Sequence, residues 1–262
     1  MTPAPDERMT AIGVTVSDGG APWLVPRVVP VENAAEVFPA PVAREAGIRL
    51  TGSAPPTGPG RLVAVRGRRD GESLRVSETR TENVVDVFTH HPAVAPGATS
   101  VFGRPRATTE HARWEEEMLR DGSILSRRYL RAEDGSWRVI VAAHDIEAAR
   151  APLERAYGAQ LTLVQVEWTR RQLDVVRNEL YRRADAWRIT THLDGTSATG
   201  VPVLRIALRE VTDEIRDWQR TLPAAMVEFF PLLAASTDDD GFDDDTRAFR
   251  HLCASPRSTE PR

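Results

Sequence analysis

The sequence predicts an α+β protein in which a β-rich N-terminal region precedes two tandem ferredoxin-like modules around a shared central strand. Three observations predict this class. Residues 1–100 contain short β-prone runs separated by Pro and Gly. Residues 109–230 run twice through the order helix, hairpin, short helix and strand. The run AQLTLVQVEW, residues 159–168, ends the first pass, and the second pass begins at the next residue.

Five runs in the N-terminal region have the composition of β-strands. The fourth run follows the third after Asp70-Gly71, a pair that readily supplies the positive φ angles of a tight hairpin turn. A Pro- and Gly-rich loop over residues 91–105 is the predicted domain boundary. The expected strands are Ala11–Val16, Trp23–Val31, Arg61–Gly67, Ser73–Thr79 and Val84–Thr89.

The first pass begins at Thr109, where apolar residues start to recur at helical spacing. Trp114 and Met118 lie on one helical face, and Gly122 fits the C-terminal end of the helix. The elements expected next are strands at Ile124–Arg131 and Trp137–Ala143, a helix capped by Asp145, and the strand Gln160–Trp168.

The second pass begins with Thr169-Arg170-Arg171-Gln172, which has the form of a capping box. Leu173, Val176 and Leu180 then mark one helical face. The elements expected next are strands at Trp187–Leu193 and Val201–Arg209, a helix capped by Thr212, and a strand at Met226–Phe230.

Counted from Gln160, this order is β-α-β-β-α-β, the ferredoxin-like arrangement. The first pass fits the same order if its opening strand comes from residues 84–89. We therefore expect one module over residues 101–168 and a second over residues 160–235. Residues 236–262 are acidic at first and polar at the end, and we expect a disordered tail there.

Charge and hydropathy exclude several classes of partner. The net charge of −4 is small for 262 residues, so we expect neither nucleic acid nor a membrane as partner. The most apolar stretch, residues 224–235, is too short to cross a bilayer. The first ten residues are polar and lack the apolar core of a signal peptide, which predicts a cytoplasmic protein.

Sequence motifs for catalysis and cofactor binding are missing. The chain contains no Lys, which excludes a standard Walker motif, and it has no Gly-x-Ser-x-Gly elbow. Residues 236–247 follow a calcium-loop spacing, but Arg247 stands where a bidentate Glu is required. We therefore expect no cofactor and no metal.

One cationic surface remains as a candidate binding site. In the run Val201–Arg209, alternate residues are apolar, which places Arg205 and Arg209 on the opposite side of the strand. Arg188 and His192 share a side of the neighbouring strand. If the apolar side faces the helices, Arg188, His192, Arg205 and Arg209 lie on an open sheet face that can hold a carboxylate or a phosphate.

These observations favour a non-enzymatic binding or assembly protein that acts through this sheet face and the acidic tail. Its partner would be a protein or a small anionic ligand. Two alternatives stay open. One is a sensor that binds an anionic metabolite at the module interface. The other is an enzyme whose site is assembled between domains from His90, His144 and His192.

Overall fold

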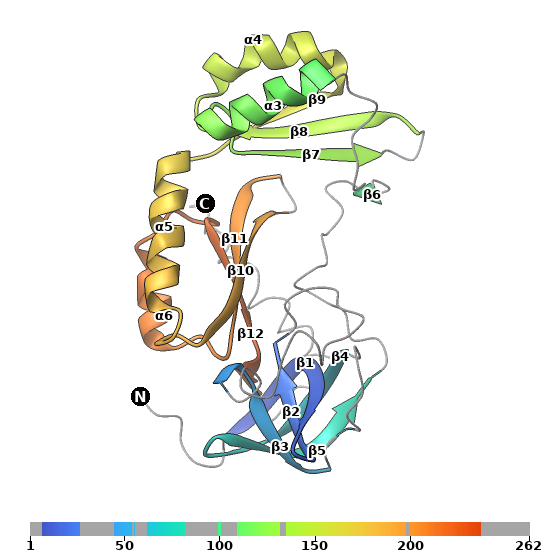
Figure 1. The fold of residues 1–262 in the computed structure, drawn as a ribbon, viewed down its shortest axis with the longest axis vertical. Helices are drawn as coiled ribbons and strands as arrows, with labels where there is room; N and C mark the ends of the chain where they lie inside the picture. Colours follow the sequence, from blue (N-terminus) through green and yellow to red (C-terminus); the bar gives the residue numbers. More distant parts are fainter. Residues whose placement is uncertain are drawn as a thin grey trace, which may run out of the picture. The chain divides into compact units, whose positions relative to one another are not determined.

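The protein has a mixed α+β fold, seen in a computed structural model that describes residues 7–26, 45–53, 55, 62–81, 99–100, 109–131, 135–197 and 200–236 (Figure 1). The chain divides into two compact units. Unit 1 comprises residues 1–90, 180–193 and 205–262, and unit 2 comprises residues 91–179 and 194–204. The predicted strand at residues 84–89 and the acidic tail lie outside the described residues.

A closed five-stranded barrel forms the first part of unit 1; the β-rich composition of this region predicted strands but not their closure into a barrel. Strand β1 pairs with both β2 and β4, which closes the order β1-β2-β3-β5-β4 into a ring. The β3–β5 pair is parallel and the other pairs in the ring are antiparallel. The strands are β1 (Arg8–Asp18), β2 (Ala21–Val25), β3 (Ile48–Gly52), β4 (Leu62–Asp70) and β5 (Ser73–Arg80).

Two glycines permit the close strand crossings of this barrel. At Gly13, β1 passes from its pairing with β4 to its pairing with β2, and a Cβ atom there would lie 2.3 Å from the carbonyl oxygen of Val25. At Gly67 the β4–β5 register shifts, and a Cβ atom would lie 2.2 Å from the carbonyl oxygen of Arg75. A side chain at either position would collide with backbone of the neighbouring strand.

The remainder of unit 1 contains most of a three-stranded sheet in the order β10-β11-β12, while residues 194–196 of β10, residues 202–204 of β11 and residues 170–179 of α5 are assigned to unit 2. Helix α6 and the C-terminal end of α5 cover one of its faces (Figure 1). Beyond β12 the chain enters the barrel, because β13 pairs with β1 and the amide of Ile12 donates to Leu232. The elements are α5 (Arg170–Arg183), β10 (Ile189–Thr196), β11 (Pro202–Leu208), α6 (Asp213–Arg220), β12 (Val227–Pro231) and β13 (Leu233–Ala235).

Unit 2 is built on a four-stranded sheet in the order β6-β7-β8-β9. Helices α3 and α4 pack on one face of it, around a core that includes Met118, Val141 and Leu153. A short 3₁₀ turn joins α4 to β9. The elements are β6 (Thr99–Ser100), α3 (Thr109–Asp121), β7 (Ser126–Arg131), β8 (Trp137–Ala143), α4 (Ile146–Tyr157) and β9 (Leu161–Gln165).

The repeated order of elements is confirmed, but the predicted strand arrangement is wrong. The order α3-β7-β8-α4-β9 recurs as α5-β10-β11-α6-β12, and Asp145 and Thr212 cap equivalent helices. A split βαβ unit requires another strand between the two parallel strands, whereas β8 and β9 are direct neighbours. Strand β9 ends its own described sheet and does not join the β10-β11-β12 sheet, so it is not a shared central strand.

Candidate functional site

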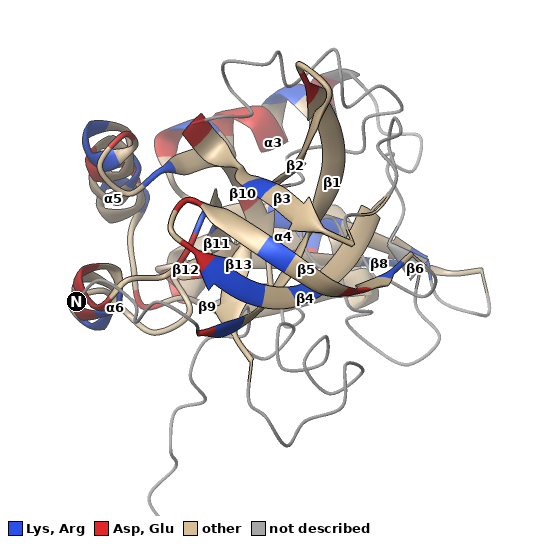
Figure 2. Cartoon of the chain, turned by 90° about the horizontal axis from the view of Figure 1, so that it is seen from below, with Lys and Arg blue, Asp and Glu red and all other residues tan. Residues whose placement is uncertain are grey.

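An arginine cluster in unit 1 is the candidate site, and we define it as Arg69, Arg188 and Arg209 together with Glu72 and Glu210. The β4–β5 hairpin supplies Arg69 at the end of β4 and Glu72 in the turn. Arg209 and Glu210 follow β11 directly, and Arg188 precedes β10. Figure 2 shows positively and negatively charged segments meeting at the β4–β5 turn. The cluster therefore joins the barrel to the three-stranded sheet within one unit.

The Arg209 side chain is the most deeply buried member of the cluster. Only 2% of Arg209 is exposed, and its Nη1 atom donates to Oε2 of Glu72 over 2.5 Å. Among the described residues, neither its Nε nor its Nη2 atom has a hydrogen-bond partner. Burial lowers the pKa of the Arg209 guanidinium despite the opposing effect of Glu72. Buried donors without partners are rare in proteins, so these two atoms require an explanation.

The carboxylate of Glu72 links two of the arginines at the surface. Its Oε2 atom accepts from Arg209 and also from Nη1 of Arg188, over 3.2 Å. Burial would raise the pKa of Glu72, but the hydrogen bonds and charges of Arg209 and Arg188 outweigh it, and the pKa is lowered. The Glu72 side chain is nevertheless 72% exposed. A single solvated carboxylate therefore serves two guanidinium groups.

The third arginine is paired in a more regular way. Arg69 donates from Nη1 and Nη2 to the two carboxylate oxygens of Glu210, over 2.7 and 3.3 Å. These hydrogen bonds raise the pKa of Arg69. The charge of Glu7 also acts on Arg69, so three guanidinium groups of this region are balanced by the carboxylates of Glu7, Glu72 and Glu210. Among the described residues, the unpaired feature of the site is therefore the set of hydrogen-bond donors on Arg209, not a net charge.

Arg188 occupies an uncommon backbone conformation. Its φ is +50°, and it follows the helix α5 and precedes β10 in a turn where its amide donates to Asp185. A bulky residue in the left-handed region costs about 1–2 kcal/mol relative to ordinary backbone. Strained positions of this type gather at functional sites. The strained Arg188 therefore lies in the same cluster as the Arg209 donors that have no partner among the described residues.

Two of the four residues predicted for the binding face lie together, and two lie elsewhere. Arg188 and Arg209 share Glu72. Arg205 is 5% exposed and pairs through Nε with Oε2 of Glu228 over 3.2 Å. Every residue of β11 is buried, so the prediction of an open face at this strand is wrong. Arg205 and Arg209 are both buried, and each pairs with a carboxylate. Such pairing allows the arginine side of an alternating strand to lie in the interior.

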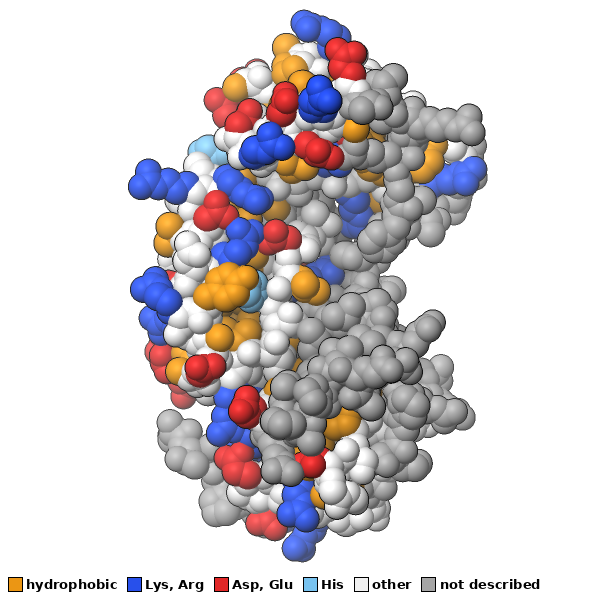
Figure 3. Space-filling model, in the orientation of Figure 1, with side chains coloured by type: hydrophobic (Ala, Val, Ile, Leu, Met, Phe, Trp, Pro, Cys, Tyr) orange, Lys and Arg blue, Asp and Glu red, His pale blue; other side chains and the backbone are white. Residues whose placement is uncertain are grey.

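His192 lies apart from the cluster and contacts helix α5. Its ring meets that of Tyr181 edge-on, with centroids 4.5 Å apart. Tyr181 is among the exposed large apolar residues, and Figure 3 shows such hydrophobic surface next to a histidine. His144, proposed as part of a catalytic site, has Nδ1 3.1 Å from the Val166 carbonyl oxygen. His90 lies outside the described residues, so a site formed by His90, His144 and His192 stays a prediction.

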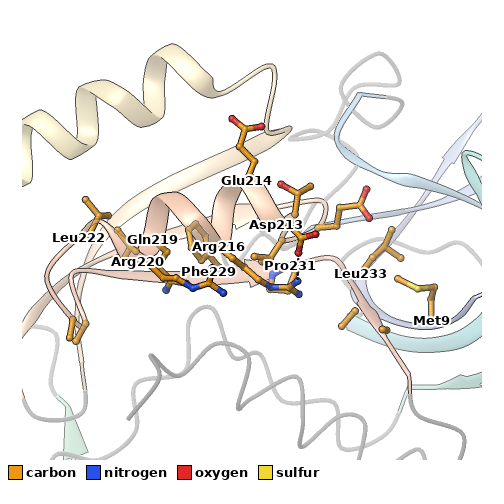
Figure 4. Close-up of a pocket in the computed structure, with 18 of the residues that line it drawn as sticks. Met9, Asp213, Glu214, Arg216, Gln219, Arg220, Leu222, Phe229, Pro231 and Leu233 are labelled. Atoms are coloured by element: carbon orange, nitrogen blue, oxygen red, sulfur yellow. Dashed lines mark hydrogen bonds and ion pairs between the residues drawn. The ribbon is translucent and has the colours of Figure 1, made fainter. Parts of the chain in front are cut away.

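A groove of about 1070 Å³ borders the arginine cluster along α6, β12 and β13 (Figure 4). Arg69 and Glu210 belong to both. Charged side chains at its rim pair with one another, as Arg216 does with Asp213 over 3.2 Å. The groove therefore has no strong charge preference of its own. Its apolar lining includes Met9, Leu222, Phe229, Pro231 and Leu233.

A second polar network lies in unit 2 and was not predicted from the sequence. Glu115 is 1% exposed, and its Oε1 atom accepts from the hydroxyls of Tyr129 and Tyr157. Its Oε2 atom contacts Nη1 of Arg127. His111 is 3.3 Å from the Tyr157 hydroxyl through Nε2. Burial and the bond to Glu115 raise the pKa of both tyrosines, so their hydroxyls stay protonated donors.

Comparison with known proteins gives no family for the chain: no family model, curated protein or solved structure matches it. Within the described ranges, no group of three or more His, Cys, Asp or Glu side chains is placed to hold a metal ion. Nor does any helix of that part have the length and apolar character needed to cross a membrane.

Proposed function

We propose that this protein is a non-enzymatic binding protein that recognises an anionic group, a carboxylate or a phosphate, at the arginine cluster. The observation that supports this most directly is the buried Arg209 guanidinium, two of whose donors have no partner among the described residues. Guanidinium donors pair most strongly with carboxylate and phosphate oxygens. Arg188 adds an accessible cation, since 46% of its side chain is exposed.

The chemical nature of the cluster favours recognition over catalysis. Guanidinium groups stay protonated in proteins and cannot act as general bases near neutral pH. Within the cluster, the carboxylates of Glu72 and Glu210 already accept hydrogen bonds from arginines. A group that is fixed by such pairs can orient an anion without transferring a proton to it.

Glu72 has a defined place in this proposal as an internal competitor. Its carboxylate lies between Arg188 and Arg209 and neutralises part of the positive charge that would attract an incoming anion. Because the side chain is largely exposed, it can leave this position at little steric cost. Its departure would leave the positive charge of both guanidinium groups available to an external anion.

The proposal is tested by titrating the protein with inorganic phosphate, with citrate and with a Glu-rich peptide in a calorimeter. Glu72→Gln should tighten binding several-fold, because it removes the competing charge. Arg188→Gln should weaken binding. Glu147→Gln is the matched control, since Glu147 is an exposed glutamate that pairs with Arg150 in unit 2. It should leave the affinity unchanged.

The three probes also separate the two kinds of partner. Binding of phosphate or citrate alone would identify a small anionic ligand. Binding of the peptide alone would identify an acidic protein segment. If no probe binds to the wild type or to Glu72→Gln, the proposed function is wrong. The acidic tail lies outside the described residues and has no part in this proposal.

A further inference from the structure

The two unpartnered atoms of Arg209 form one edge of its guanidinium group. In arginine, the Nε–H bond and one N–H bond of Nη2 lie in the plane of the guanidinium group. They point in parallel from the edge that faces away from Cδ. This pair is the fork that matches the two oxygens of a carboxylate or phosphate. Glu72 contacts Nη1, which lies at the other end of the group. The bidentate edge of Arg209 is therefore intact and unused among the described residues.

The surroundings of this edge favour an anion over a neutral partner. Arg209 is buried, so its charge is poorly screened by solvent. The charges of Arg188 and Arg69 act on Arg209 in addition. In the part of the chain that the structure describes, Glu72 is the one carboxylate bonded to Arg209, and it is shared with Arg188. A water molecule could accept a hydrogen bond from the edge, but it would not offset the charge of the Arg209 guanidinium.

We infer that the Nε–Nη2 edge of Arg209 binds two oxygens of a single carboxylate or phosphate group. This inference rests on the proposed function and deepens it, because it assigns the planar fork as the specificity element. The ligand must then carry two oxygens on one atom at the spacing that the fork requires. A monatomic anion such as chloride would accept from both donors at a single centre, so it matches the parallel fork less well than two oxygens do and should bind more weakly.

The test compares acetate, inorganic phosphate and chloride at equal ionic strength, with the thermal midpoint of the full chain as readout. Acetate or phosphate should raise the midpoint of the wild type in a saturable way, and chloride should raise it less. Arg209→Lys keeps a positive charge but lacks the fork, and should weaken oxyanion binding about tenfold or more. Arg205→Lys is the matched control, because Arg205 is also buried but pairs with Glu228. It should keep the oxyanion effect.

A measurement on the wild type covers the case in which Arg209→Lys fails to fold. The arginine Nε–H signals in a ¹⁵N spectrum report directly on the edge, and one of them should move more with acetate or phosphate than with chloride. A response to acetate alone identifies a carboxylate ligand, and a response to phosphate alone identifies a phosphate ligand. Equal responses to chloride and to the oxyanions would overturn the fork and leave the proposed function standing. No response to any anion, with Glu72→Gln also silent, would overturn both.

Discussion

The buried carboxylate of Glu115 offers the sharpest test of the energetics of unit 2. Glu115→Gln keeps the shape of the side chain and removes its charge. The amide oxygen can still accept from Tyr129 and Tyr157, but Arg127 loses the anion that it contacts. Arg127 is only 12% exposed, so its charge would then be buried without compensation. Breaking one side of a buried ion pair costs about 3–5 kcal/mol, and we expect a loss of about 3 kcal/mol.

Urea unfolding followed by tryptophan fluorescence measures this loss, since Trp114 and Trp137 pack against the same core. Glu117→Gln on the same helix is the control, because Glu117 is exposed and its loss should change stability by less than about 0.5 kcal/mol. Tyr157→Phe removes one hydrogen bond to a charged group and should cost about 1.5–3 kcal/mol. If Glu115→Gln costs less than about 1 kcal/mol, the network does not depend on the carboxylate charge and the reasoning fails.

Three further outcomes follow from the geometry of unit 1, each measured by urea or thermal unfolding. Arg188→Gly should be more stable than Arg188→Ala by about 1 kcal/mol, because both lose the ion pair and only Gly relieves the positive φ; equal stabilities would contradict the strain. Gly13→Ala should cost about 1–3 kcal/mol through its clash with Val25, and a neutral effect would show that β1 can shift. Replacing Arg205 and Glu228 together by Met should leave the free energy of unfolding at pH 7 unchanged or raise it by about 1–4 kcal/mol. The reason is that burial raises the pKa of Glu228 and so disfavours its charged form. A large loss of stability would show that the pair stabilises the fold.

Local features of the fold were predictable because they depend on residues close in sequence. The capping box at Thr169 is confirmed by reciprocal hydrogen bonds with Gln172. Asp145 and Thr212 cap their helices as expected. Gly71 has a positive φ of 57° in the predicted hairpin turn. Each of these features depends on residues within about four positions of one another, so it can be predicted without knowing any tertiary contact.

Strand order was not predictable in the same way, because it depends on which distant edges meet. The apolar run around β9 reads as a strand covered on both sides. In the structure it is a five-residue strand beside β8, with most of its side chains partly exposed. Apolar character showed that a strand exists here, but not which neighbours it has. The order of helices and strands along the chain was therefore predictable, whereas the strand order of a ferredoxin-like sheet differs from the one in the structure.

The candidate site shows the same limit at the level of side chains. Alternation along β11 separated Arg205 and Arg209 from the leucines, and this suggested a solvent-exposed face. Glu72, which pairs with Arg209, lies 137 residues away in the sequence. No local pattern links the two positions. In α3, Glu115 stands next to Trp114 among several acidic residues, and nothing in the sequence marks it as the buried one.

The pairing of β13 with β1 has a consequence for how the chain folds during synthesis. Leu232 and Leu233 belong to the same apolar core as Met9, Leu24 and Leu74 of the barrel. The ribosome makes those barrel residues early, but their core stays incomplete until the last described strand has been translated. The N-terminal barrel must therefore wait, with apolar surface uncovered, while more than half of the chain emerges. The barrel is completed by a contact between two segments that are distant in the sequence and are synthesised at different times.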